Sequence, residues 1–312
     1  MEAKNTGWQK EKIRKIIALV LVLLLLGASI LVTCIPGGWK QVFAFCGLSE
    51  FSDRAEGYPF AVHVLDVGKA DAVLVDCEDA YLLVDCGMWD DGETVAAYLK
   101  KRGISHLDYA VATHPDSDHI GGFPTVLEQI PVNQFVEPVI ASSLLENNAP
   151  YQSMAAVLEQ KRTLRREVAA GDMFHLNGAT VEVLSPAEEM ESTNDSSVVL
   201  KITYGETSFL LMGDAEENAE KRLLQSGAEL RADVLKVGHH GSATSTSAEF
   251  LQAVSPKMAA ISVGEDRNNL PKDEVLRRLQ AQQVETYRTD LDGTLLFVSD
   301  GETITVMTER AA

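Results

Sequence analysis

Basic residues, cysteines and internal repeats are all scarce in this chain of 312 residues. Lys and Arg number 27 against 46 Asp and Glu, which gives a net charge of −19 at pH 7. Without the first fifteen residues, which carry five basic and two acidic side chains, the balance becomes −22. Proteins that adhere to nucleic acid regardless of sequence neutralise phosphates with Lys and Arg. The composition argues against such adhesion, but it permits a local phosphate site built around metal ions.

The four cysteines are too few to form a disulfide framework in a domain of this size. They are Cys34, Cys46, Cys77 and Cys86. A turn at residues 78–79 would pair Cys77 with Ala80 rather than with Cys86, so a bridge between these two cysteines stays an open alternative. The chain also has no repeat of fixed period, which excludes a repeat architecture. Its only dense basic run, residues 161–166 (KRTLRR), is typical of the solvated end of a helix.

A long apolar run stands near the N-terminus. The twenty residues 16–35 contain no charge, follow a basic tail at residues 1–15, and end before Pro36. At helical rise they match a bilayer core of about 30 Å, so we predict one transmembrane helix. The positive charge before it predicts a cytoplasmic N-terminus, with everything after Pro36 outside the cell membrane. The residues before Cys34 make a poor site for signal cleavage or lipid attachment, which favours a retained anchor over these two alternatives.

The rest of the chain predicts one large domain. Residues 36–58 show no clear period and are interpreted as a linker, and residues 59–312 form the domain. Apolar strands, for example 70–77 and 107–114, are interleaved with helical segments such as 216–227. Hairpins mixed with strand–helix units predict an α/β fold of two sheets covered by helices, a four-layer αβ/βα sandwich. Ligands in such folds gather in loops at strand ends.

One loop is crowded with groups that bind metals. The stretch 112–122 (ATHPDSDHIGG) follows an apolar strand and contains four such side chains, namely His114, Asp116, Asp118 and His119. Alternate residues of an extended segment point the same way, so the first three can converge on one side. Neighbouring carboxylates repel one another unless a cation neutralises them, which predicts a divalent metal here. The alternative is a solvated acidic loop that caps a helix.

Two further clusters follow apolar strands. Asp214 ends the segment FLLMGDA, where Gly213 lets the backbone bend, and its carboxylate could bridge two cations. His239 and His240 follow the strand of LKVGHHGSATSTS, together with hydroxyl groups that could contact an oxyanion. Helix capping explains each segment taken alone. Together with the first loop they indicate a metal site, because all three clusters lie at the ends of apolar strands.

These segments resemble the metallo-β-lactamase-fold hydrolases, and in particular the extracytoplasmic hydrolase-like domain of the ComEC competence family. The resemblance covers residues 60–308 and rests on segments in matching order, among them HVLDVGKADAVLV, LLVDCG, THPDSDHIGG, FLLMGDAE and LKVGHHGSATSTS. It implies the four-layer fold, two bound metal ions and hydrolytic activity.

The resemblance also implies roles for single residues. Six are implied metal ligands, namely His114, Asp116, Asp118, His119, Asp214 and His239. The first metal would be bound by His114 and Asp116, and Asp214 would bridge to the second, where His239 is preferred to His240. Asp118 and Asp214 are the expected catalytic carboxylates. Groups expected to orient ligands or contact substrate are Asp66, Asp85, Lys236, His240 and Ser242.

The sequence departs from the family pattern in several places. The middle histidine of most members has no counterpart, since Asn194, Ser196 and Ser197 occupy that region, so the first metal is expected to be held loosely or to be absent. Lys69 and Ala70 stand where the competence family usually has Gln and Gly. Residues 264–276 lack the histidine of the family's Gly-His-Pro stretch. The channel-forming membrane domain of ComEC has no counterpart, so we expect no DNA transport by this chain alone.

The leading hypothesis from the sequence is a membrane-anchored, extracytoplasmic hydrolase that uses two divalent ions to cleave phosphodiesters such as DNA. The oxygen-rich first site favours Mn²⁺, with Zn²⁺ as the alternative. Candidate phosphate contacts are Lys236 and the hydroxyls of Ser242, Thr244 and Ser245. Two alternatives stay open. One is hydrolysis of a small phosphoester, lactone or β-lactam, and the other is a non-catalytic binding component whose incomplete metal site serves structure.

Overall fold

The computed structural model describes residues 55–187, 190, 192–265 and 267–310, together with the single residues Lys15 and Thr33. The chain divides into two compact units, residues 1–54 and 55–312. The predicted tail, the predicted anchor and most of the predicted linker lie outside the described residues. Within the described ranges, no helix combines the length and the apolar character needed to cross a bilayer.

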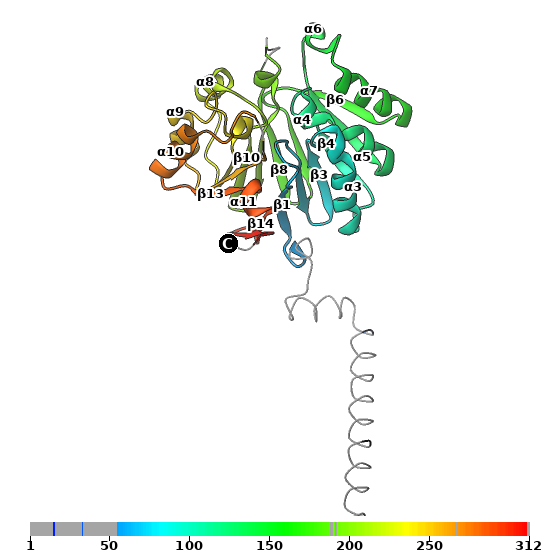
Figure 1. The fold of residues 1–312 in the computed structure, drawn as a ribbon, viewed down its shortest axis with the longest axis horizontal. Helices are drawn as coiled ribbons and strands as arrows, with labels where there is room; N and C mark the ends of the chain where they lie inside the picture. The colour runs from blue at the N-terminus through cyan, green and yellow to red at the C-terminus, as the bar shows by residue number, and fades with distance from the viewer. Residues whose placement is uncertain are drawn as a thin grey trace, which may run out of the picture. The chain divides into compact units, whose positions relative to one another are not determined.

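The second unit contains two β-sheets (Figure 1). Eight described strands form the first sheet in the order β15-β14-β1-β2-β3-β4-β5-β6. Their bounds are β1 Phe60–Val64, β2 Val73–Cys77, β3 Ala80–Val84, β4 Leu107–Val111, β5 Val132–Pro138, β6 Leu164–Val168, β14 Leu295–Ser299 and β15 Ile304–Thr308. Seven form the second, in the order β13-β12-β11-β10-β9-β8-β7. These are β7 Met173–Leu176, β8 Ala179–Ser185, β9 Val199–Tyr204, β10 Thr207–Leu211, β11 Val234–Lys236, β12 Met258–Ile261 and β13 Glu285–Arg288.

Helices cover the outer face of each sheet, which makes the four-layer sandwich that the sequence predicted (Figure 1). On the first sheet lie α3 Gly92–Lys101, α4 Ser117–Ile120, α5 Phe123–Gln129 and α7 Ala149–Lys161, whereas the short helix α6 Ser142–Leu145 has no buried residue and lies at the top of the view in Figure 1. On the second lie α8 Glu217–Ser226, α9 Ala248–Val254 and α10 Asp273–Ala281. The short helix α11 Thr289–Asp292 follows β13.

Strand alternation builds a core on each side of the first sheet. In β2, Val73 and Val75 point into the apolar layer between the sheets, whereas Leu74 packs under the outer helices. Side chains of a strand alternate between the two faces of its sheet, so a strand covered on both faces reads as a continuous apolar run. Such runs are why the central strands could be located from sequence.

The β2–β3 hairpin has the predicted register, with Cys77 opposite Ala80. Cys77 and Cys86 are both buried and free, so the alternative of a bridge between them is wrong. Two strands were not predicted, β6 and β7. The basic run falls on the first of these, because the helix ends at Lys161 and the chain continues as an edge strand.

Parallel strand pairs bring the suspected clusters to one edge of the sandwich. In the first sheet β3 runs parallel to β4, and in the second sheet β10 runs parallel to β11. The loop with His114 follows β4, Asp214 follows β10, and the two histidines follow β11. The carboxyl ends of parallel neighbours lie at the same edge of a sheet. The topology therefore gathers three segments that are far apart in sequence.

Candidate metal centre

The loop after β4 is fixed by backbone contacts to the end of β3. The Cys86 amide donates to the His119 carbonyl at 2.7 Å, and the Gly122 amide donates to the Gly87 carbonyl at 3.1 Å. A Cβ atom added at Gly122 would lie 2.0 Å from the Cys86 carbonyl oxygen, so only glycine fits this approach. The loop has little freedom, and its side chains are held in place before any ligand binds.

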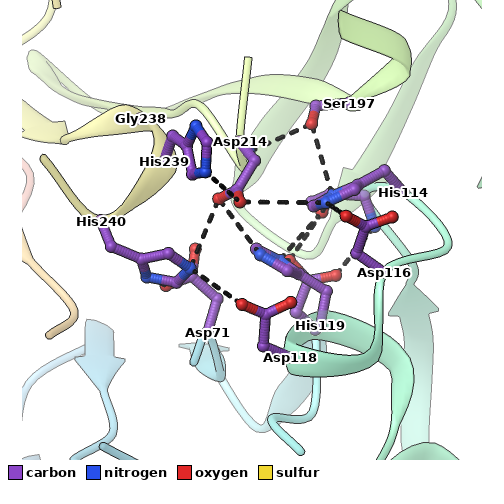
Figure 2. Close-up of polar contacts among 12 residues, drawn as sticks. Asp71, His114, Asp116, Asp118, His119, Ser197, Asp214, Gly238, His239 and His240 are labelled. Atoms are coloured by element: carbon purple, nitrogen blue, oxygen red, sulfur yellow. Dashed lines mark hydrogen bonds and ion pairs between the residues drawn. The ribbon is translucent and has the colours of Figure 1, made fainter. Parts of the chain in front are cut away.

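Side chains from three strand ends converge around Asp214 (Figure 2). The His119 Nε2 atom lies 3.1 Å from Asp214 Oδ1, and the His240 Nε2 atom lies 3.6 Å from the same oxygen. On the other side, His114 Nε2 lies 4.0 Å from Asp214 Oδ2. Donor atoms in tetrahedral array about 2.1 Å from one ion lie roughly 3.4 Å apart, so this spacing is what a bound cation requires.

Asp116 and Asp118 stand at opposite ends of this group. Asp116 Oδ2 lies 3.8 Å from His114 Nε2, and Asp118 Oδ2 lies 3.6 Å from His240 Nε2. One group of donor atoms comprises Asp118, His119 and His240, and another comprises His114, His119 and Asp214, so that His119 belongs to both. Asp116 lies beside His114.

The burial of these groups tests whether they suit a metal. Five polar atoms of this region are buried and are not satisfied by a hydrogen bond of good geometry among the described residues, namely His114 Nε2, His119 Nε2, His240 Nε2, Asp214 Oδ1 and Asp71 Oδ1. Ion-pair distances do join some of them, since His119 Nε2 lies 3.1 Å from Asp214 Oδ1 and Asp71 Oδ1 lies 3.0 Å from Lys236 Nζ. Buried polar groups without partners are rare because each costs about 1–3 kcal/mol. Such a cluster of imidazole nitrogens and carboxylate oxygens is a donor set that suits a divalent cation.

The second nitrogen of each imidazole is already engaged. His119 Nδ1 lies 2.7 Å from Asp85 Oδ2, and His240 Nδ1 lies 2.9 Å from the Ser262 carbonyl oxygen. His114 Nδ1 lies 3.1 Å from Thr113 Oγ1. Metal-binding histidines use one nitrogen for the ion and the other for an orienting partner, which fixes the tautomer. The residues present therefore fit a metal centre.

Charge interactions set the protonation of the group. Burial raises the pKa of the Asp214 carboxyl, but the charges of His119 and His240 outweigh burial and hold this pKa well below its usual value. Burial lowers the pKa of His119, but the charges of Asp214 and Asp85 outweigh it and raise this pKa well above the usual value. Burial and the charge of His119 lower the pKa of His114 to about 4. At pH 7 the metal-free chain therefore holds His119 protonated and His114 neutral.

Metal binding at neutral pH is expected to release a proton. An imidazole binds a metal only in its neutral form, so the proton that Asp214 and Asp85 keep on His119 must leave when the ion binds. We expect release of about one proton per chain at pH 7, and an affinity for Mn²⁺ that rises with pH above pH 6.5. Calorimetry in buffers of different ionisation enthalpy measures the released proton. A binding enthalpy independent of the buffer contradicts the expectation.

The structure indicates which of the adjacent histidines, His239 or His240, is the better candidate for a metal ligand. His239 was preferred as a ligand, but its Nδ1 lies 3.0 Å from Glu216 Oε1 and its Nε2 lies 3.7 Å from Asp214 Oδ2. Its ring is partly exposed, whereas His240 is fully buried. His240 belongs to two of the donor groups, and His239 belongs to none of those found among the described residues. The geometry therefore favours His240.

The remaining groups that were predicted to orient ligands or contact substrate have different partners in the structure. Asp66 Oδ2 accepts a hydrogen bond from Arg310 at 2.5 Å, so it does not join the converging carboxylates. Lys236 is buried, and its ammonium donates to Asp71 at 3.0 Å, so its place corresponds to an orienting group rather than to a substrate contact. Ser242 Oγ is linked to Thr244 Oγ1 at 2.9 Å. Asp85 does lie beside the centre, where it orients His119.

Asp71 is the residue that the sequence interpretation missed. Its carboxylate lies between Lys236 and His240, 3.0 Å and 3.6 Å from their nitrogens, and it is buried. Its amide donates to the Asp118 carbonyl at 3.0 Å, which ties the β1–β2 loop to the metal-binding loop. The signal was present, because Asp71 stands in the segment LDVGKADAVLV just before a buried strand.

Ser197 lies where the family's middle histidine is absent. It is buried, its Oγ accepts from the Asp214 amide at 3.1 Å, and it lies 3.4 Å from His114 Nδ1. Ser197 therefore contacts both Asp214 and His114, two candidate ligands of the first metal. Because it lies beside Nδ1 of His114, the Nε2 atom of that ring is the one that can bind the ion.

Comparison with known proteins agrees with this geometry. Residues 65–265 match the family described as the Metallo-beta-lactamase superfamily. ComE operon protein 3 of Bacillus subtilis strain 168 is 33% identical over 256 residues, which cover 76% of this chain and 32% of that protein. Competence protein ComA of Neisseria gonorrhoeae is 33% identical over 287 residues, which cover 89% of this chain and 38% of that protein. The chain spans about a third of the length of these relatives.

A solved structure shares the fold. CmlA, a diiron beta-hydroxylase from Streptomyces venezuelae, matches with a TM-score of 0.54 and 13% identity over 80% of this chain and 54% of that chain. At this identity the likeness concerns the arrangement of sheets and helices alone.

Proposed function

Because the chain belongs to the metallo-β-lactamase superfamily, we propose that it is a metal-dependent hydrolase of phosphodiesters that works with two divalent ions. The observation that supports this most is the set of buried imidazole nitrogens and carboxylate oxygens that lie, group by group, within 4.8 Å of one another. Charged groups are tolerated at such distances when cations compensate them.

Each side chain would have a distinct task. Asp118, His119 and His240 would hold one ion, and His114 with Asp116 would hold the other, while Asp214 would serve both. When bound, the ions activate water as a nucleophile and neutralise charge that develops on the phosphate oxygens. Asp85 and the Ser262 carbonyl orient two of the imidazoles, so the ligands need little rearrangement. The set of His114, Asp116 and Asp214 is rich in oxygen and has a single histidine, which favours Mn²⁺ at that position.

The substrate class rests on the relatives and on the chemistry of the centre. The relative from Neisseria gonorrhoeae is named a competence protein, and we propose DNA as the phosphodiester for this chain. The chain covers only part of such proteins, so cleavage of DNA remains a proposal for this chain alone.

A broad basic groove is not part of the proposal. Within the basic run, Arg165 forms two hydrogen bonds to Glu137, and Arg166 pairs with Asp172 at 2.8 Å. These cations are already neutralised by carboxylates and supply little attraction for a phosphate chain. The substrate would therefore be bound mainly at the metal centre.

We also propose that residues 16–35 anchor the chain in the cell membrane, with the hydrolase domain on the outer side. The support is the charge-free apolar run and the basic residues before it. Recovery of the chain in the soluble fraction of lysed cells would contradict this.

A non-catalytic binding component is the second candidate function. The observation that favours it is Ser197 in place of a histidine, which leaves the first metal position with His114, Asp116 and Asp214. In that case one ion, or none, would serve only the stability of the fold.

Turnover by the purified full-length chain separates the candidates. With Mn²⁺ we expect cleavage of linear DNA and of bis(4-nitrophenyl) phosphate, and loss of both activities with a chelator. Nitrocefin and 4-nitrophenyl acetate serve as the β-lactam and ester comparisons. Turnover of these two alone supports the small-ester alternative, and turnover of none supports the binding component.

A further inference from the structure

A second lysine lies much nearer to the metal centre than the one that the sequence indicated. The ammonium of Lys69 donates to Asp118 Oδ2 at 2.5 Å. The side chains of Lys69 and Asp118 are 22% and 11% exposed, so this pair lies at the solvent-facing side of the centre. Lys236, in contrast, has a side chain that is only 2% exposed and is committed to Asp71.

We propose that Lys69 is a substrate-binding residue, whose ammonium contacts a non-bridging oxygen of the phosphate beside the second metal position. This rests on the proposed function, because it assigns a group for the anion that the same centre would cleave. Asp118 is a candidate ligand of that ion, and its oxygen keeps the ammonium next to the metal position. The lysine is thereby placed where a phosphate bound to the ion would meet it.

The backbone around Lys69 is held firmly, so the ammonium is positioned in advance. Gly68 has φ +70°, and a Cβ added at Gly264 would lie 2.6 Å from Gly68 Cα and 2.8 Å from the Lys69 amide nitrogen. The loop is closed further by the bond from the Leu65 amide to the Ala72 carbonyl at 2.9 Å. The backbone of this loop is held by the Leu65–Ala72 hydrogen bond and by close packing against Gly264. The backbone therefore loses little conformational entropy when Lys69 binds an anion.

The positive charge of Lys69 lies in a strongly acidic part of the protein. Four aspartates converge at the centre, namely Asp71, Asp116, Asp118 and Asp214, in a chain whose net charge is −19. The positive charge of Lys236 is used by Asp71 inside the protein. Lys69 is likewise paired, with Asp118, but Asp118 is a candidate metal ligand. A bound ion would take up part of the negative charge of that carboxylate, which leaves the ammonium able to attract a phosphodiester in otherwise acidic surroundings.

Lys69→Gln removes the charge but retains a side chain that can donate a hydrogen bond. Lys69→Arg keeps the charge, and Lys257→Gln removes an exposed lysine that pairs with Asp233 on the other sheet.

The test measures binding of inorganic phosphate by calorimetry to the Mn²⁺-loaded full-length chain, with metal content determined for every variant. We expect Lys69→Gln to weaken phosphate binding about 10- to 100-fold, the worth of a charged hydrogen bond, at unchanged metal content. Lys69→Arg should retain most of the affinity, and Lys257→Gln all of it. With bis(4-nitrophenyl) phosphate, Lys69→Gln should raise KM more than it lowers kcat.

Three results overturn the proposal: phosphate affinity that is unchanged in Lys69→Gln, a change in metal content that accounts for the loss, or a wild-type chain that binds no phosphate. The first leaves the proposed function intact if the wild-type chain still cleaves phosphodiesters. Phosphate binding that depends on Lys69 without any turnover contradicts the proposed function and leaves this inference standing.

Discussion

Asp214→Asn is expected to lower kcat for phosphodiester cleavage by about 10³-fold or more, and to lower the metal content of the chain. Asp214 lies between both donor groups, with its two oxygens 3.1 Å from His119 and 4.0 Å from His114. The amide has the same size but carries no charge, and it offers one oxygen in place of two. The substitution therefore weakens both metal positions at once. Metal analysis and initial rates at saturating substrate measure the two effects.

The control for this variant is Asp273→Asn, which removes an exposed carboxylate from the start of α10. It should retain wild-type kcat and metal content. The melting temperature of Asp214→Asn without metal should lie below that of the metal-free wild type, because the variant loses the buried ion pair between Asp214 and protonated His119. A variant with full metal content and nearly normal kcat contradicts the assignment of Asp214.

Removal of the metal from the wild-type chain is expected to lower Tm by about 10 °C. A ligand present at a thousand times its Kd stabilises the native state by about 4 kcal/mol, and about 1 kcal/mol corresponds to roughly 2–4 °C in a domain of this size. Loss of the ions also restores the repulsion among the carboxylates around Asp214. Differential scanning calorimetry with and without a chelator measures the shift.

Readdition of Mn²⁺ should restore Tm, and Asp214→Asn should show a much smaller shift than the wild type. An unchanged Tm after verified removal of the metal argues against both the hydrolase and the structural metal site, since each requires bound ions in the native state.

Local patterns were sufficient to predict the sandwich and the segments that build its centre. His114, Asp118 and Asp214 each follow an apolar strand, and the end of a strand can be recognised from the sequence itself. The edge strand β6 was missed because its charged residues gain their partners only in the fold, where Arg165 meets Glu137 of β5. Its solvated, charged character resembles the end of a helix when the chain is read alone.

The choice between neighbouring residues could not be made from local sequence. His239 and His240 both have positive φ, 48° and 52°, and the direction of each ring depends on distant partners. Glu216 engages the first ring and the Ser262 carbonyl engages the second. Whether Lys69 or Lys236 can contact a substrate could not be predicted either, because the partner of Lys236, Asp71, lies 165 positions away in the sequence. No short pattern contains such long-range pairings.

Anomalous diffraction from crystals of the Mn²⁺-loaded chain is the most direct test of the metal centre. We expect two anomalous peaks, one between His114, Asp116 and Asp214, and one between Asp118, His119 and His240. A map with no peak within coordination distance of the Asp214 carboxylate would contradict this expectation.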